Sequence, residues 1–156
     1  MNDVINFLNQ NKIQYVLHKH PAFFTCEDSK KHNFPKKGAH CKNLFIKERK
    51  SRRFFLYIIP SHKKASLDEF EKLVGCKVKF ANPQNLKDIL GVEPGSVSFF
   101  GLLNDKKKIV EVLIDKEIYE AEYVNFHPNI NTQTLEIPKE FFHKLLSTLS
   151  NSWQVI

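Results

Sequence analysis

The chain has 156 residues, which is the size of one ordinary domain, and we expect a single domain over residues 1–156. Hydrophobic residues make up 42% and charged residues 26%, with 5 glycines and 7 prolines, and this composition excludes disordered, collagen-like and coiled-coil proteins. The formal net charge of +7 predicts an anionic partner.

Hydrophobic periodicity predicts short helices alternating with strands in the first half of the chain. Capping residues open two of the helices, and a charged turn between two β-rich runs indicates an antiparallel hairpin. The expected helices are Asp3–Asn9, Thr25 to about His32, and Ser66 to Gly75, and the expected strands are Tyr15–His18, His40–Lys47, Phe54–Ile59 and Lys77–Phe80.

The second half of the chain continues the same alternation. A helix is expected from Asn82-Pro83 to Gly91, because proline suits a first helical turn and glycine suits a helix end. Strands Val97–Phe100, Ile109–Ile114, Glu122–Phe126 and Thr132–Glu136 follow, then a helix Lys139–Leu149 and a strand Trp153–Ile156. This order favours a mixed α/β domain, with helices around a closed or strongly curved sheet.

Several classes of protein lack their signals here. No run approaches the ~20 apolar residues that span a bilayer, so we expect a cytoplasmic protein with no membrane partner. Cys26, Cys41 and Cys76 are irregularly spaced, which suggests reduced thiols rather than a disulfide framework or a zinc site. His18-x-His20 alone makes a weak metal site, and phosphate-binding glycine motifs are missing, so neither metal nor cofactor is expected.

Positive charge is concentrated early in the chain. From Lys30 to Arg53 there are ten basic residues against a single acid, Glu48. Nucleic acid is the commonest polyanion that such a stripe binds in a cytoplasmic protein. The alternative is a solvated face that serves only solubility.

Three segments carry side chains or backbone groups suited to chemistry. Lys42 and Asn43 interrupt a strand that otherwise reads as buried, and an unpaired buried ammonium is costly, so Lys42 is expected to face a cleft. Strand alternation sends the two side chains to opposite faces unless the strand bends. The Gly91–Ser96 turn could present backbone N–H groups to an oxyanion, and His127 ends a strand before a proline turn. The alternatives are that Lys42 forms an ion pair, that Gly91–Ser96 is an ordinary turn, and that His127 forms a hydrogen-bonded corner.

Taken together and in this order, five segments resemble the YbaK/ProX family, the editing domain associated with prolyl-tRNA synthetases. The segments are His20–Thr25, Gly38–Phe45, Leu90–Val97, Gly101–Asp105 and Phe126–Thr132. The resemblance covers nearly the whole chain. It implies a mixed α/β fold with a curved, barrel-like, mostly antiparallel sheet, and a metal-free hydrolase of aminoacyl-tRNA esters that acts in trans.

The resemblance also implies a substrate. The Lys-Asn-Leu-Phe strand, the Asn104-Asp105 pair and the His127-Pro128-Asn129 corner are most similar to the free-standing type that removes alanine from tRNA(Pro). The alternatives are a Cys-tRNA(Pro) deacylase of the YbaK type, a non-catalytic aminoacyl-tRNA-binding module and a small-molecule ester hydrolase. Periodicity does not decide between alanine, cysteine and serine. Prolyl-tRNA synthetase is an implied partner, and DNA is not.

Catalytic roles follow from the resemblance residue by residue. Lys42 would anchor the phosphate or ribose of the terminal adenosine and favour the negative transition state, while Asn43 would hold the substrate or shape the pocket. Gly95 matches the glycine of the family's Gly-x-x-x-Pro loop, whose proline is Phe99 here, and this change puts the rigidity of the loop in question. His127 would bound the pocket or hydrogen-bond the substrate, with a general base as the alternative.

Substrate-binding and tRNA-binding residues complete the expected site. Phe24 and Thr25 would line the amino-acid pocket, and Pro94, Ser96 and Asn129 would lie around the ester. The acceptor stem would lie on a basic surface formed by Lys36, Lys37, Lys47, Arg49, Lys50, Arg52 and Arg53.

Overall fold

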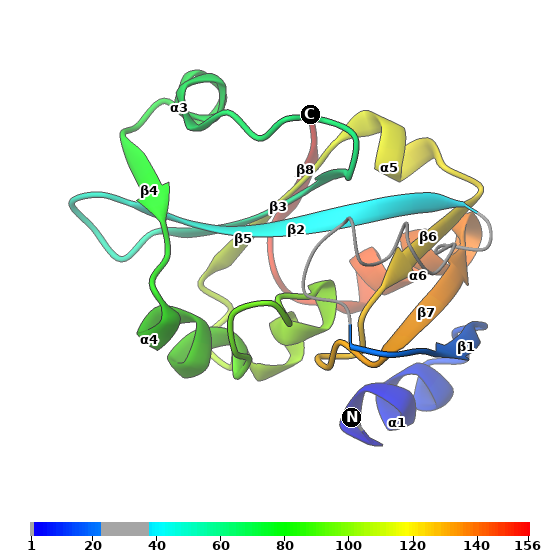
Figure 1. Cartoon of the computed structure of the whole chain (residues 1–156). Coiled ribbons are helices and arrows are strands. Elements are labelled where there is room, and N and C mark those ends of the chain that lie inside the picture. The colour runs from blue at the N-terminus through cyan, green and yellow to red at the C-terminus, as the bar shows by residue number, and fades with distance from the viewer. Residues whose placement is uncertain (1, 23–37) are drawn as a thin grey trace.

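The computed structural model describes residues 2–22 and 38–156 (Figure 1). Its strands are β1 (Val16–Lys19), β2 (Ala39–Glu48), β3 (Phe54–Pro60), β4 (Val78–Phe80), β5 (Val110–Ile114), β6 (Tyr123–Phe126), β7 (Gln133–Pro138) and β8 (Trp153–Val155). Its helices are α1 (Asn2–Gln10), α3 (Leu67–Val74), α4 (Pro83–Asn85), α5 (Lys116–Glu120) and α6 (Lys139–Thr148), with a π-helical turn η1 (Leu86–Leu90) and a 3-10 helix η2 (Phe99–Asn104).

The strands form one eight-stranded mixed sheet in the order β1-β7-β6-β2-β3-β5-β8, with β4 also paired to β2. The β2–β3, β2–β4, β6–β7 and β1–β7 pairs are antiparallel, and the β2–β6, β3–β5 and β5–β8 pairs are parallel. The mixed α/β class and the β2–β3 hairpin are therefore confirmed. Antiparallel pairs outnumber parallel pairs only narrowly within the described part of the chain.

Strand β2 is where the sheet divides. Its N-terminal end pairs with β6 through Ala39 and His40, and its C-terminal end pairs with β4 from Ile46 to Glu48. β3 accompanies β2 on the other side throughout. Among the described strands, none pairs with the remaining edge of β2 between these two ends, and this is the stretch that contains Lys42.

Helix ends follow the predicted capping residues. The Ser66 hydroxyl accepts a hydrogen bond from the Glu69 N–H at the start of α3, and Gly75 ends the helix with a φ of 76°. Asn82 caps α4 in the same way, and the chain continues through η1 to Gly91. The expected helix from Thr25 to His32 lies outside the described residues.

Two expectations about local structure are wrong. Residues 99 and 100 belong to η2 rather than to a strand, because the Ser98 hydroxyl accepts from the Phe100 N–H and opens a helical turn. Helix α5 was not expected, although Asp115 caps it by accepting from the Glu117 N–H. In both cases a side-chain cap outweighs a short apolar run.

The core lies on both faces of β2 and β3. Cys41 and Phe45 join a main cluster with alternate residues of β3, whereas Ile46 joins a smaller cluster beneath α3. Phenylalanine provides much of the bulk: the largest fully buried side chains include Phe54, Phe55, Phe70, Phe99, Phe100, Phe126 and Phe142. Within the described residues, no helix is both long enough and apolar enough to cross a membrane.

Candidate active site

Lys42 and His127 both follow the end of the β2–β6 pairing. That parallel pairing joins Ala39 to Val124 and His40 to Asn125 and ends there. Lys42 lies two residues beyond His40 on β2, and His127 lies two residues beyond Asn125, just after the end of β6 at Phe126. Because side chains alternate with a period of two, Lys42 shares the face of His40, and an extended chain gives His127 the face of Asn125. The register therefore directs two residues that are 85 positions apart in the sequence toward one face, beyond the last paired residues.

The Lys42 side chain is half-buried on this face, opposite Ile59 of β3. Within residues 2–22 and 38–156 its ammonium group makes neither an ion pair nor a hydrogen bond. An internal ion pair was the main alternative to a functional role, and the described residues contain no such pair. The charge is free to meet a ligand.

Polar side chains share one face of β6, β7 and the end of β1, and we call them the polar face: Asn125, Thr134 and Glu136, which are buried, and His18 and His20, which are partly exposed. His18 Nε2 lies 3.2 Å from Glu136 Oε1, and His20 Nε2 lies 2.7 Å from Thr134 Oγ1. Glu136 is only 3% exposed. Both histidines are thus engaged by protein groups. Sequence reasoning missed Thr134 and Glu136, because in a strand of alternating pattern they read as ordinary outward-facing residues.

His127 is held in one tautomer. Its Nδ1 lies 2.8 Å from the backbone oxygen of Gln133, which can only accept, so Nδ1 carries the proton and Nε2 presents a lone pair. Burial lowers the pKa of the His127 imidazole below its usual value, and the nearby His20, whose ring centroid is 6.1 Å away, acts in the same direction. His127 is therefore a neutral hydrogen-bond acceptor at physiological pH.

Two hydrogen bonds tie the glycine loop to this histidine corner. The Ser98 hydroxyl donates to the His127 carbonyl, and Asn129 Nδ2 donates to the Phe100 carbonyl over 3.2 Å. Gly95 lies three residues before Ser98 with a φ of 89°, a conformation that glycine adopts without strain. The predicted loop and the predicted corner therefore form one unit.

The Ser96 amide differs from what the sequence suggested. Its N–H donates to the Glu93 carbonyl over 3.0 Å and closes a turn, so it does not face a ligand. The Gly95 N–H has no such partner among the described residues, and Pro94 and Gly95 are both exposed. Gly95 is thus the better placed of the two amides for an oxyanion.

Phe99 replaces the loop proline with an aromatic anchor. Its side chain is fully buried and stacks on Phe126 at a centroid distance of 5.3 Å, with Phe142 packed edge-on at 5.7 Å. Each such aromatic contact adds about 0.5–1.5 kcal/mol to the area that it buries. Packing therefore fixes the end of the loop without a proline.

Asn43 lies away from Lys42. Strand alternation places it on the face of Cys41 and Phe45, opposite Ile58 in the main core. Its Oδ1 atom is buried and accepts no hydrogen bond from residues 2–22 or 38–156. Hydrogen bonds thus join the Gly95 loop to the His127 corner, and Asn43 lies on the opposite face of β2 from Lys42. Phe24, Thr25, Lys36 and Lys37 lie outside the described residues, and their roles stay predictions.

A model of the aminoacyl-tRNA editing domain matches residues 20–145 of the chain. The chain belongs to the aminoacyl-tRNA editing family. Members of this family are hydrolases of aminoacyl-tRNA ester bonds, and the family confirms the resemblance drawn from the sequence.

Known relatives agree with this assignment. The prolyl-tRNA editing protein ProX of Acetoanaerobium sticklandii is 32% identical over 98% of this chain and 94% of its own length. A prolyl-tRNA synthetase associated domain-containing protein of Xenopus laevis is 29% identical over 94% of this chain and 90% of its own. A solved structure described as a proposed trans-editing enzyme for prolyl-tRNA synthetase has the same fold, with a TM-score of 0.74 at 16% identity over 99% of this chain and 93% of that one.

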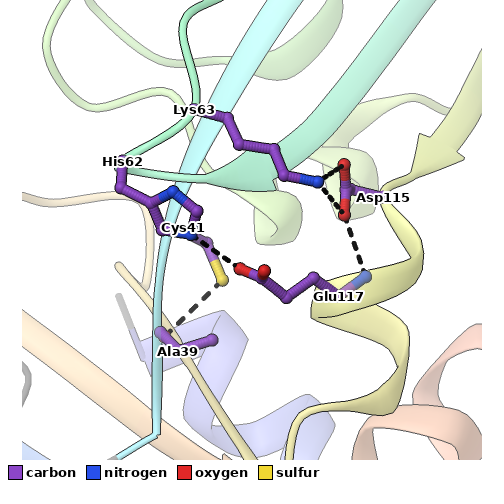
Figure 2. A network of polar contacts seen from close by, with 6 residues as sticks. All are labelled: Ala39, Cys41, His62, Lys63, Asp115 and Glu117. Atoms are coloured by element: carbon purple, nitrogen blue, oxygen red, sulfur yellow. Dashed lines mark hydrogen bonds and ion pairs between the residues drawn. The ribbon is translucent and has the colours of Figure 1, made fainter.

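Cys41 of this editing domain is not a nucleophile. Its buried thiol donates to the Ala39 carbonyl at 3.7 Å, and burial raises its pKa to about 12 (Figure 2). The polar network in the same view has a structural role: Lys63 pairs with Asp115 at 2.9 Å, and His62 with Glu117 at 2.9 Å. These ion pairs join the loop after β3 to the start of α5.

The Asn104-Asp105 pair of the editing domain is also structural. Asp105 is 3% exposed and accepts from the Ile109 and Val110 amides, and from Asn151 Nδ2 at 2.8 Å. Asn104 Nδ2 donates to the Leu90 carbonyl at 2.7 Å. These contacts hold η2 against β5 and η1, so this family motif supports the loop that carries Gly95.

In the basic turn between β2 and β3, some cationic side chains have partners within the described residues and others do not. Lys47 donates to the Glu48 and Ser51 carbonyls, Arg49 donates to the Val78 carbonyl, and Arg53 forms a two-point ion pair with Glu111. Lys50 and Arg52 are exposed and have no acidic or carbonyl partner in the described structure. The Arg52 guanidinium lies 5.3 Å from the ring centre of Phe54.

Proposed function

We propose that the protein is a trans-acting editing deacylase of mischarged tRNA(Pro), and that its substrate is Ala-tRNA(Pro). The observation that carries the proposal is the parallel β2–β6 register, which ends two residues before Lys42 on one strand and two residues before His127 on the other. The family match and the relative named for prolyl-tRNA editing support the choice of tRNA.

Lys42 supplies positive charge to the reacting end of the tRNA. Ester hydrolysis passes through a tetrahedral intermediate with a negatively charged oxygen, and a fixed cation in a half-buried site stabilises this charge more than water does. Because the ammonium group has no partner among the described residues, it can bind the terminal adenosine or the developing oxyanion without breaking an existing contact.

His127 and Gly95 position the substrate and the attacking water. The neutral His127 offers Nε2 as an acceptor to a substrate or water donor, and its bond to Gln133 holds the ring in place. Gly95 offers a backbone N–H on a loop that Ser98 fastens to the His127 carbonyl. An aminoacyl ester is already labile, so positioning and oxyanion stabilisation are sufficient for hydrolysis.

The need for such an enzyme follows from the limits of size selection. A pocket shaped for proline rejects the smaller alanine by only about 1–3 kcal/mol, because missing methylene groups are all that distinguish the two. A second pocket that admits alanine and excludes proline by size corrects the resulting errors. The predicted wall of this pocket is Phe24 and Thr25.

The distance along the chain supports a contact of the basic turn with the acceptor stem rather than with the ester. Seven residue steps lead from Lys42 along β2 to Arg49, just past its end, which at ~3.3 Å each is about 23 Å. Lys50 and Arg52 would therefore contact the phosphates of the stem while Lys42 holds the 3′ end. Lys42, Lys50 and Arg52 would thus give the positive charge of the β2–β3 hairpin a role in binding the tRNA.

A single-turnover deacylation assay tests the proposal with tRNA(Pro) charged with alanine, cysteine, serine or proline. We expect alanine to be released fastest and Pro-tRNA(Pro) to survive. If cysteine is released fastest, the substrate is Cys-tRNA(Pro), as in deacylases of the YbaK type. Binding of all four without hydrolysis would identify a non-catalytic module, and hydrolysis of simple alanine esters at the same rate would remove tRNA from the function.

A further inference from the structure

A basic pocket lies between the β2–β3 turn and the loop after η2. Its volume is about 340 Å³, and Arg52, Lys106 and Lys107 line it together with Asp88 and Asp105. Arg52 comes from the turn that we assign to the acceptor stem, whereas the two lysines lie more than 50 positions later. The fold thus extends the basic surface beyond the stretch that the sequence singled out.

The pocket has three cations and two carboxylates, and the hydrogen bonds of both carboxylates come from neutral amide donors among the described residues, so a net charge of one positive unit remains. Asp105 is buried, and its carboxylate already accepts two backbone amides and Asn151. Asp88 accepts from Gln84 Nε2 over 2.7 Å. Lys106 and Lys107 are exposed, and neither side chain has a hydrogen bond or ion pair within the described residues. Three cations are therefore available for an anion.

Arg52 is held in a defined position at the edge of the pocket. Its guanidinium lies 5.3 Å from the ring centre of Phe54, and cation–π contacts of this kind restrain an arginine while leaving its N–H donors free. A planar guanidinium with two flexible ammonium groups is a common combination for phosphate oxygens. The pocket is consequently suited to a phosphate group.

The pocket also adjoins the support of the glycine loop. Asn104 forms part of its wall and donates to the Leu90 carbonyl, one residue before Gly91. Gly91 begins the segment that leads to Gly95. An anion in the pocket therefore lies at the base of the candidate catalytic loop, on the side of the basic turn.

We propose that this pocket binds a backbone phosphate of the tRNA acceptor stem, with Arg52, Lys106 and Lys107 as its ligands. The proposal rests on the proposed function, because it needs an RNA substrate, and it adds Lys106 and Lys107 to the tRNA-binding residues. Free inorganic phosphate has the same chemistry, and the experiment distinguishes the two sources.

The test compares the wild type with a Lys106→Gln/Lys107→Gln variant, using an uncharged hairpin RNA with the acceptor-stem sequence of tRNA(Pro). The matched control is Lys116→Gln/Lys144→Gln, which removes two exposed lysines elsewhere. Affinity is measured at several salt concentrations. We expect the pocket variant to bind at least about tenfold more weakly, and the slope of log K against log salt to fall by about one for each lysine removed.

Deacylation separates this proposal from the function on which it rests. The pocket variant should need more Ala-tRNA(Pro) for half-maximal rate and keep the wild-type rate at saturation. If the wild type binds the hairpin with the expected salt slope but hydrolyses no charged tRNA, the proposed function fails and the phosphate site stands. The site would be overturned if the pocket variant kept the wild-type affinity and salt slope, or if the control variant lost as much affinity. It would also be overturned if the pocket variant lost binding of inorganic phosphate but still bound the RNA as wild type does.

Discussion

The Ser98 hydroxyl donates a hydrogen bond to the backbone carbonyl of His127, and this bond joins the glycine loop to the histidine corner. The same hydroxyl accepts from the Phe100 amide and opens η2. One side chain therefore joins the end of the loop to His127, the residue that follows β6.

Ser98→Ala should lower both activity and stability. We expect a fall of about 10- to 100-fold in the single-turnover rate, because small displacements of positioning groups cost this much. Loss of the cap and of a buried hydrogen bond should reduce the free energy of unfolding by about 1–2 kcal/mol. Ser66→Ala is the control: it removes the cap of α3, at similar cost in stability, and should leave the rate unchanged. Equal rates for wild type and Ser98→Ala would show that the bond is not needed for positioning.

Burial of His127 should make the protein less stable in mild acid. Its pKa is lowered in the folded state, so the unfolded chain takes up a proton that the native chain does not. The cost is absent above the unfolded value of about 6.5, grows as pH falls below it, and is complete below the folded pKa. Urea unfolding at pH 7.5 and pH 5 should therefore show a smaller loss for His127→Gln than for wild type. An identical pH dependence for His127→Gln and wild type would contradict the assignment.

Removal of the Asp105 carboxylate should destabilise the fold without affecting the chemistry. Asp105→Ala leaves the Ile109 and Val110 amides and Asn151 Nδ2 without their acceptor, and we expect a loss of about 2–4 kcal/mol in the free energy of unfolding. The deacylation rate per folded molecule should stay near that of wild type. Asp68→Ala, an exposed control, should change stability by less than about 0.5 kcal/mol. If the deacylation rate of Asp105→Ala falls by more than the fraction of unfolded protein explains, Asp105 has a direct role in catalysis.

Cys41 should be inert in the native protein. Only the thiolate reacts with alkylating reagents, and burial raises the pKa of this thiol to about 12. In a Cys26→Ser/Cys76→Ser variant, iodoacetamide at pH 8 should leave Cys41 unmodified until denaturant is added. The matching Cys26→Ser/Cys41→Ser variant should react in the native state, because Cys76 is partly exposed. Rapid native labelling of Cys41 would show that β2 opens at the position before Lys42.

Local signals predicted most elements, and non-local contacts explain the failures. Ser66, Asn82, Gly75 and Gly91 mark helix ends through contacts within a few residues, so their meaning is readable from the sequence. The parallel pairing of β2 with β6 depends on segments some 85 positions apart, and no local pattern encodes its register. The proximity of Lys42 and His127 could thus be suggested only through the family resemblance.

The polar face could not be predicted for a related reason. Glu136 and Thr134 occupy the alternate positions of a strand, where a polar side chain usually meets solvent. In the fold Glu136 contacts His18 of β1, Thr134 contacts His20 just after β1, and both are buried. Asn43 shows the converse case: strand alternation predicted that it would face away from Lys42 unless the strand bends, and the uninterrupted register of β2 with β3 keeps it on the other face.

The most direct test of the account is the single-turnover deacylation of Ala-tRNA(Pro) by a Lys42→Met variant, which keeps the length of the side chain and removes its charge. We predict a rate at least about 100-fold below wild type, as for the loss of one oxyanion-stabilising group, with stability changed by less than about 0.5 kcal/mol. Lys79→Met, which alters an exposed lysine of β4, should retain the wild-type rate. The central claim is that this ammonium group acts on the ester. A Lys42→Met protein that is folded, binds the tRNA and hydrolyses the ester within about twofold of the wild-type rate would contradict it. A tenfold change in rate corresponds to about 1.4 kcal/mol, so a twofold change leaves almost no stabilisation of the transition state to this group.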